Sequence, residues 1–225
     1  MVENEALEQK GSVVRVYQKI ETLLDRDEKT FKVLPGRYRL AEFLLIKEWR
    51  VTEKIDGMNI RIHLHSDGRV EYHGRTDKAE LPLFLVQFLL GQLPSEVVRA
   101  AFASDTEAIL YGEGYGEKIQ SGGNYRLGVS FRLFDVVVLA VGRCWWLSWE
   151  NIEDVAKKLG VRTVPVLART ASLDEAVTFA LGHSLVAAEE RQRQYPREGI
   201  VARTDPPLFT RRGDRLMWKL KQRDL

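Results

Sequence analysis

The sequence predicts an α+β domain in which antiparallel sheets are flanked by helices. Two patterns predict it: apolar and polar residues alternate between Trp49 and His73, and apolar residues recur at helical spacing over 81–103. Strands that pair sequentially, with helices between groups of strands, are typical of an α+β fold and not of a doubly wound sheet. At 225 residues the chain has the size of one domain. We expect a single domain over 1–225, with 1–45 as an N-terminal helix and loop extension.

The first half of the chain is expected to hold a helix, three strands and two further helices. Apolar residues at helical spacing predict a helix over 13–24, and Pro35-Gly36 marks a turn. Alternating residues predict strands over 51–55 and 60–64, with a break at Gly57. A turn at 66–69 leads into a third strand over 70–73, and Pro94 divides the helical stretch 81–103 in two.

The second half is expected to hold strands over 108–112 and 129–141, joined by a glycine-rich stretch. Helices follow over 150–159 and 172–194, and Ser172 with Glu175 predicts a capping box at the start of the second. Strands over 199–203 and 216–221, on either side of a Pro206-Pro207 loop, complete the domain.

The composition excludes collagen-like, coiled-coil and disordered chains, since 44% of the residues are hydrophobic and 29% are charged. Cys144 is the single cysteine, so an internal disulfide and a CxxC zinc site are excluded and a reducing compartment is indicated. The N-terminus lacks a signal-peptide pattern, and no apolar run reaches the roughly 18 residues of a membrane span. We therefore expect a cytoplasmic protein that does not bind a membrane.

The net charge of +2 conceals a strongly basic C-terminal segment. Residues 191–225 hold ten of the 34 Lys and Arg but four of the 32 acids, which gives this segment +6 and leaves −4 for the other residues. Such a concentration can hold phosphates or a nucleic-acid backbone. A solvated charged face is the alternative interpretation.

The sharpest local signal is Lys54-Ile55-Asp56-Gly57, at the end of a predicted strand. A lysine followed by a glycine that lets another chain approach the backbone suits a lysine nucleophile. This tetrad alone is a weak signal, because a strand that ends in a turn with an exposed lysine has the same pattern.

Further polar and aromatic features follow in order along the chain: Arg75, Glu113, Phe134, Glu198, and the pair Lys219 and Lys221. Glu113 lies between Gly112 and Gly114, where the missing side chains would let a ligand reach backbone and carboxylate together. The two lysines share one face of a strand. Each feature has a plainer alternative: a core phenylalanine, surface acids or solvated lysines.

In this order the residues resemble the covalent nucleotidyltransferase superfamily of polynucleotide ligases and mRNA capping enzymes. The resemblance runs from about Glu53 to Lys221. The Asn59 that follows Lys54-Ile55-Asp56-Gly57 resembles the residue found in the RNA ligase branch, specifically in the nick-sealing phage-type enzymes. DNA ligases and capping enzymes usually have arginine at this position. The resemblance implies a nucleotidyltransferase (adenylation) fold, ATP as the AMP donor, and Mg²⁺ or Mn²⁺.

The resemblance also implies a role for each site residue, with Lys54 as the residue that ATP adenylylates. The other implied contacts are Glu53 and Ile55 beside the adenine, Asn59 and Arg75 at phosphate and ribose, Glu113 at the ribose hydroxyl, Phe134 stacked on the base, Glu198 at the metal, and Lys219 and Lys221 at the phosphates. A lysine attacks phosphorus only when neutral, and its reference pKa is about 10.4, so surrounding cations help. Transfer to phosphorus needs neutralised charge and in-line placement, and Mg²⁺ needs only one or two carboxylates.

The implied function is an ATP-dependent RNA ligase that joins 3′-hydroxyl and 5′-phosphate ends of nicked or broken RNA through a lysyl-AMP on Lys54. A minimal DNA ligase or a capping-type guanylyltransferase would share the lysyl-nucleotide step, and a non-catalytic RNA-binding module would share the fold. We expect no C-terminal OB or helical domain after Lys221. We therefore expect RNA to be gripped by residues 1–50, by the surface around 191–215, or by a partner subunit or a second copy in a homodimer.

Three histidines could meet across the predicted hairpin. His63 and His65 share a strand face, and His73 lies on the paired strand. A metal site is one interpretation, and partly exposed strand histidines are the other.

Overall fold

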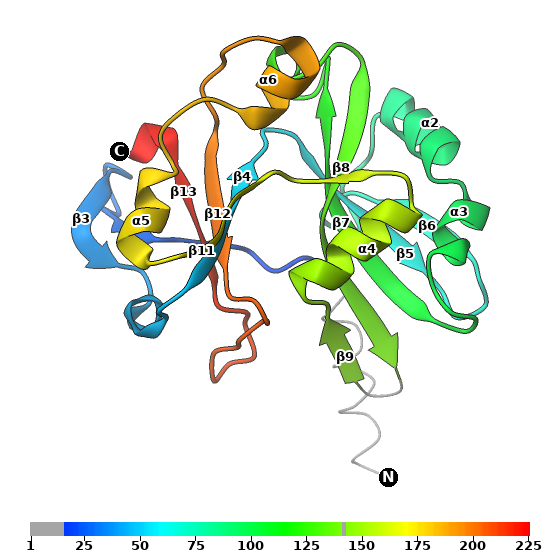
Figure 1. Cartoon of the computed structure of the whole chain (residues 1–225), viewed down its shortest axis with the longest axis horizontal. Coiled ribbons are helices and arrows are strands. Elements are labelled where there is room, and N and C mark those ends of the chain that lie inside the picture. Colours follow the sequence, from blue (N-terminus) through cyan, green and yellow to red (C-terminus); the bar gives the residue numbers. More distant parts are fainter. Residues whose placement is uncertain (1–15, 141–142) are drawn as a thin grey trace. The chain divides into compact units, whose positions relative to one another are not determined.

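The computed structural model describes residues 16–140 and 143–225, and its contacts divide the chain into two compact units (Figure 1). Within the described residues, unit 1 comprises 16–17, Gly57–Gln120 and Gly128–Thr163, and unit 2 comprises Gln18–Asp56, Ser121–Leu127 and Val164–Leu225. The α+β class with largely antiparallel sheets is confirmed in both units. Among the described residues, no helix has both the length and the apolar character needed to cross a membrane.

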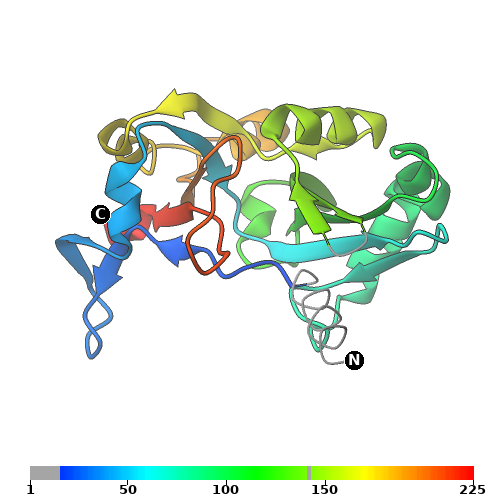
Figure 2. The same ribbon diagram turned by 90° about the horizontal axis from the view of Figure 1, so that it is seen from below.

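Unit 2 is built on a five-stranded sheet with the order β1-β13-β12-β4-β11. Its strands are β1 (Glu21–Thr22), β4 (Trp49–Lys54), β11 (Val166–Ala171), β12 (Gly199–Arg203) and β13 (Met217–Lys221). The central strand β12 pairs antiparallel with both β4 and β13. Figure 2 shows β1 beside β13, to which it is parallel.

Smaller elements complete unit 2. They are the hairpin β2 (Leu24–Arg26) and β3 (Val33–Tyr38), the helices α5 (Leu173–Thr178) and α6 (Leu185–Arg191), and the 3-10 turns η1 (Ala41–Leu45), η2 (Gly122–Asn124) and η3 (Gln222–Asp224). One sheet face forms the core, where the Trp49 ring packs edge-on against Phe43 at 5.9 Å and lies 5.7 Å from Trp218. Edge-to-face packing of buried aromatic rings stabilises such a core beyond the area it buries.

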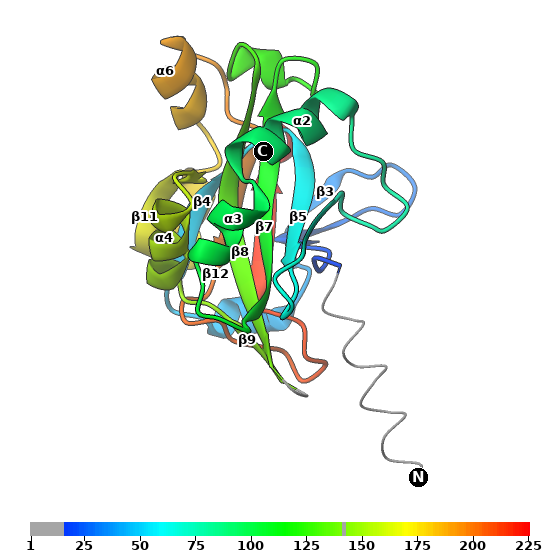
Figure 3. The ribbon, with the colours of Figure 1, turned by 90° about the vertical axis from the view of Figure 1, so that its right-hand side faces the viewer.

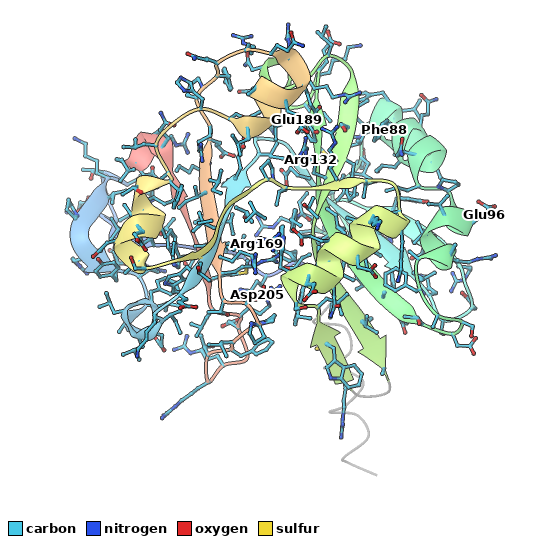
Figure 4. The ribbon with its side chains drawn as sticks, viewed as in Figure 1. Phe88, Glu96, Arg132, Arg169, Glu189 and Asp205 are labelled. Carbon is cyan, nitrogen blue, oxygen red and sulfur yellow. The ribbon has the colours of Figure 1, made fainter. Side chains whose placement is uncertain are left out.

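Unit 1 is built on a second sheet with the order β10-β8-β7-β5-β6, and β9 pairs with β8. Its elements are β5 (Met58–Leu64), β6 (Val70–His73), β7 (Glu107–Gly116), β8 (Val129–Ala140), β9 (Arg143–Trp146), β10 (Arg162–Thr163), α2 (Leu83–Gln92), α3 (Ser95–Ala100) and α4 (Trp149–Lys158). Helices α2 and α3 lie over the sheet in Figure 3, and Leu85 and Leu89 of α2 are fully buried. On β8, Arg132 (labelled in Figure 4) donates to Tyr115 Oη at 3.0 Å.

Two helix predictions are wrong. Residues 16–24 form no helix: Tyr17 packs on Tyr111 and Phe134 in unit 1, while β1 pairs with the distant β13. Residues 13–15 lie outside the described residues. The helix predicted over 172–194 is instead two short ones, α5 and α6, because the chain between them passes through Gly182 at φ +118°, a conformation that cannot continue a helix.

Candidate functional site

Lys54 is the last residue of β4 and lies in a row of residues across three strands. In the β4–β12 pairing Lys54 is opposite Gly199, and in the β12–β13 pairing Gly199 is opposite Lys221. Lys219 lies two residues before Lys221, so the two lysines share a face of β13 as predicted. The register therefore brings Lys54 and Lys221 to one end of the sheet.

Glu198, directly before β12, joins the two lysines. Lys54 Nζ lies 2.6 Å from Glu198 Oε2, and Lys221 Nζ lies 2.6 Å from Oε1. The exposed fractions of the three side chains are 24%, 15% and 24% for Lys54, Glu198 and Lys221. Burial by itself would raise the pKa of Glu198, but the two ammonium groups outweigh it and lower that pKa. The result is an ionised carboxylate between two cations.

Gly199 makes this close arrangement possible. Its φ of +155° lies in a region that L side chains rarely adopt, and an added Cβ would stand 2.1 Å from the Leu220 carbonyl oxygen. A larger residue would push β12 away from β13 at the point where Glu198 and Lys221 meet. The glycine in Glu198-Gly199 is therefore required by strand packing.

Glu53 lies on the opposite face of β4 from Lys54, because neighbouring strand residues alternate. Its side chain is in the protein interior, and the residue is only 1% exposed. Ser184 Oγ donates to its Oε1 at 2.5 Å, and the Leu185 backbone N–H donates to its Oε2 at 2.8 Å. Burial raises the pKa of Glu53, and these hydrogen bonds offset only part of that effect. Ile55, the next predicted contact, is also buried.

The segment that holds Glu53 was not predicted from the sequence. Ser184 caps α6 and accepts from the Ala187 N–H, so one hydroxyl both begins the helix and binds the carboxylate. Helix α6 is tied to residues 121–127 through Arg126 and Glu190, 3.2 Å apart, and through Arg191, which donates to the Gly123 carbonyl. Ser184 before an apolar run was a capping signal, hidden by the prediction of one continuous helix.

Four other predicted site residues, Asn59, Arg75, Glu113 and Phe134, belong to unit 1. Asn59 on β5 is directly opposite Glu113 on β7, so the sheet brings these two together. Asn59 Oδ1 is buried and has no hydrogen-bond donor among the described residues. An acceptor without a partner at this position is suited to a bound ligand.

The glycines beside Glu113 do not have the predicted purpose. An added Cβ at Gly112 would meet the Phe131 ring at 2.1 Å, and one at Gly114 would meet Leu85 and Ile60 at 3.2 Å. Both glycines therefore make room for the core of unit 1, and the expectation that they open space for a ligand is wrong.

Phe134 and Arg75 lie in different surroundings within unit 1. Phe134 is half-buried, and its ring is edge-on to Tyr17 with the centroids 5.2 Å apart. Arg75 is exposed in the connection between β6 and α2.

Part of the basic C-terminal segment is structural. Arg215 is 4% exposed, and its backbone exchanges hydrogen bonds with the Gln18 side chain. Arg197 donates to the Phe179 and His183 carbonyls. Asp205 (labelled in Figure 4) binds Arg50 at 2.7 Å. The exposed cations of the β12–β13 connection are thereby reduced to Arg211 and Arg212.

Comparisons with known proteins point to one family. A family model described as RNA ligase matches residues 47–221. Comparison with curated protein sequences gave no match.

Solved structures of Naegleria gruberi RNA ligase share the fold. A lysine-to-alanine variant with ATP and Mn is 17% identical with a TM-score of 0.62, over 92% of this chain and 60% of that chain. A lysine-to-methionine variant with AMP and Mn is 20% identical with a TM-score of 0.61, over 91% of this chain and 61% of that chain. This chain thus spans about three fifths of the length of those ligase chains.

Proposed function

This chain belongs to the RNA ligase family, and we propose that it is an ATP-dependent ligase that seals nicked or broken RNA. In this proposal Lys54 takes AMP from ATP, the AMP passes to an RNA 5′-phosphate, and an adjacent 3′-hydroxyl displaces AMP to join the strands. ATP and Mn in the Naegleria gruberi structures support the choice of nucleotide and the need for a divalent metal.

The observation that carries the proposal is the Lys54–Glu198–Lys221 arrangement. A lysine 2.6 Å from a carboxylate that also holds a second lysine is a positioned amine with a cation nearby. A binding module would need basic side chains but no acid between them. Transfer of a nucleotide to a lysine uses the amine as the nucleophile and a second cation to neutralise phosphate charge, and in this proposal the acid orients the amine.

The first step can be assigned to atoms of unit 2. Lys54 Nζ releases a proton to water and attacks the α-phosphorus of ATP. A P–N bond forms as the nitrogen loses a second proton to water, and the bond from that phosphorus to the bridging oxygen breaks to release pyrophosphate. Glu198 Oε2 orients Nζ before the attack and must release it. Lys221 and Lys219 then bind the phosphate oxygens, because negative charge on these oxygens must be neutralised in the transition state.

Glu198 is suited to a metal ion as well as to the lysines. Its lowered pKa keeps the carboxylate ionised, and Mg²⁺ or Mn²⁺ is commonly held by one or two carboxylates together with substrate phosphates. When bound, such an ion would neutralise phosphate charge. The remaining implied contacts, Glu53, Ile55, Asn59, Arg75, Glu113 and Phe134 with the nucleotide, are part of the proposal. The unpaired Asn59 Oδ1 supports one of them.

The proposed partner is RNA, and the exposed Arg211 and Arg212 are candidates for contact with its backbone. A partner subunit or a second copy of this chain would provide further contacts with the RNA. We also propose that the protein works in the cytoplasm.

The test is covalent labelling of the full chain with α-labelled ATP and Mg²⁺, followed by denaturing electrophoresis. We expect label on the wild-type polypeptide and none on Lys54→Ala. Lys47→Ala, an exposed lysine before the same strand, is the matched control and should label normally.

Parallel reactions with α-labelled GTP and labelled NAD decide between classes. Label from GTP alone would assign the chain to capping-type guanylyltransferases. Absence of label from all three nucleotides in folded protein would contradict the enzyme proposal. If the protein is labelled, a comparison of its sealing of nicked RNA and of nicked DNA identifies the substrate.

A further inference from the structure

Three histidines and a glutamate gather on one face of the β5–β6 hairpin in unit 1. His63 lies directly opposite Glu71 in the strand pairing, and because alternate residues of a strand share a face, His65 and His73 lie on the same side. The proposed ligase reaction uses none of them.

The ligand atoms are already close. One ligand atom from each of His63, His65 and Glu71 lies within 4.8 Å of those of the other two. Glu71 Oε2 lies 3.1 Å from His65 Nε2 and 3.2 Å from His73 Nε2. Zn–N and Zn–O bonds of about 2.0–2.1 Å put tetrahedral ligand atoms about 3.3 Å apart, so modest side-chain rotation suffices to bind a metal.

The charges around Glu71 favour a cation. The Glu71 carboxylate supplies the acidic ligand of the cluster, because its Oε2 lies within 3.2 Å of both His65 Nε2 and His73 Nε2. Its other oxygen, Oε1, lies 3.4 Å from Arg69, so Oε2 faces the histidines. The His63 and His65 ring centroids are 3.8 Å apart, so the two imidazoles lie side by side. Neutral imidazole is the form that binds metals.

Glu107 gives the cluster a supporting carboxylate. Its Oε1 lies 2.9 Å from His63 Nε2. Metal-bound histidines commonly donate their second ring N–H to a carboxylate, which fixes the tautomer and the ring orientation. Arrangements of imidazole and carboxylate ligands suit Zn²⁺ better than Mg²⁺, which prefers oxygen ligands alone.

The geometry points to a Zn²⁺ site formed by His63, His65 and Glu71, with His73 as the fourth ligand. The His63 and His65 rings turn out of their stack on binding so that their lone pairs converge. Strand β6 is at the edge of its sheet, and the ion would fasten this edge strand to β5. The role is structural and belongs to unit 1.

The test is a Zn²⁺ titration of chelator-treated, full-length protein against a chromogenic competitor, without ATP or RNA. We expect one tightly bound equivalent, with affinity about 10-fold or more weaker in both His65→Gln and Glu71→Gln. His183→Gln is the matched control, since His183 is the one histidine outside the cluster and is exposed. Circular dichroism checks that each variant is folded.

Cobalt provides a second readout. Co²⁺ bound at this site should give the intense visible absorption of a tetrahedral complex in wild type and His183→Gln, and lose it in His65→Gln. No stoichiometric Zn²⁺ binding by the wild type would overturn the site. So would Zn²⁺ binding that Glu198→Gln abolishes and Glu71→Gln leaves unchanged. The titration needs no nucleotide, so a failure of lysine labelling leaves its outcome interpretable.

Discussion

Unit 2 contains two carboxylates on neighbouring strands: Glu53 is on β4, and Glu198 directly precedes β12. Their surroundings shift their pKa values in opposite directions. Glu53 meets a serine hydroxyl and a backbone N–H in the interior, and burial raises its pKa. Glu198 is also partly buried, but two ammonium groups lower its pKa. The comparison shows that two ammonium groups in direct contact, at 2.6 Å, outweigh the effect of burial on Glu198, whereas the partners of Glu53 do not outweigh it.

The largest expected effect is on the rate of lysyl-AMP formation, which should distinguish Glu198 from Glu53. Glu198→Gln should slow formation of the lysyl-AMP by about 100-fold or more, because the carboxylate that orients Lys54 and is suited to hold the divalent metal is lost. Its unfolding free energy should change by no more than about 1 kcal/mol, since the lysines are partly solvated. Labelling time courses with α-labelled ATP measure the rate, and urea unfolding measures the stability.

Glu53→Gln is the reciprocal variant of that experiment. It should cost about 1–3 kcal/mol of unfolding free energy, because an amide cannot accept from both Ser184 and Leu185. Its rate of labelling should fall less than that of Glu198→Gln. Equal rate losses in the two folded variants would remove the distinction between the carboxylates.

A smaller effect is expected from the hydroxyl that holds Glu53. Ser184→Ala removes both the donor to Glu53 and the cap of α6, and we expect it to cost about 1–2 kcal/mol in urea unfolding. Ser172→Ala, at the capping box of α5, is the matched control: it loses a cap but no buried carboxylate contact. If Ser184→Ala were no more destabilising than Ser172→Ala, the Ser184–Glu53 hydrogen bond would contribute nothing to stability.

Much of this site could be predicted from local sequence. Three site residues stand at strand ends: Lys54 ends β4, Glu198 directly precedes Gly199 of β12, and Lys221 ends β13 two residues after Lys219. The register of these strands brings the three ends together. The helix predicted over 172–194 failed because apolar spacing does not register the positive φ of Gly182, and the role of Ser184 was lost with it. Gly112 was misjudged since its neighbour, the Phe131 ring, comes from another strand.

The N-terminal prediction failed for a similar reason. The apolar residues of 16–24 have helical spacing, but β1 finds its partner in β13 at the other end of the chain. Leu23 then packs in the core of unit 2. Pairing between such distant segments leaves no periodic signal in either one.

The smallest effect is the pH dependence of stability, which should have opposite signs for the two acids. The raised pKa of Glu53 means that its ionisation destabilises the fold as pH rises above its ordinary value of 4.5. Relative to wild type, Glu53→Gln should therefore gain stability as pH rises above 4.5. The lowered pKa of Glu198 means that its stabilisation is present above 4.5 and is lost as pH falls below that value.

Relative to wild type, Glu198→Gln should thus be most destabilised above pH 4.5, and the difference should shrink at lower pH. Urea unfolding of the three proteins at closely spaced pH values from about 3 to 7 measures both trends. Parallel curves for the two variants would show that their surroundings do not distinguish the acids.

The most direct test of the central claim is peptide mapping by mass spectrometry after incubation of the wild-type chain with ATP and Mg²⁺. We expect AMP attached to the peptide that contains Lys54, at that side chain, and a much lower yield in Glu198→Gln. AMP attached to another lysine, or a folded protein that carries none, would contradict it.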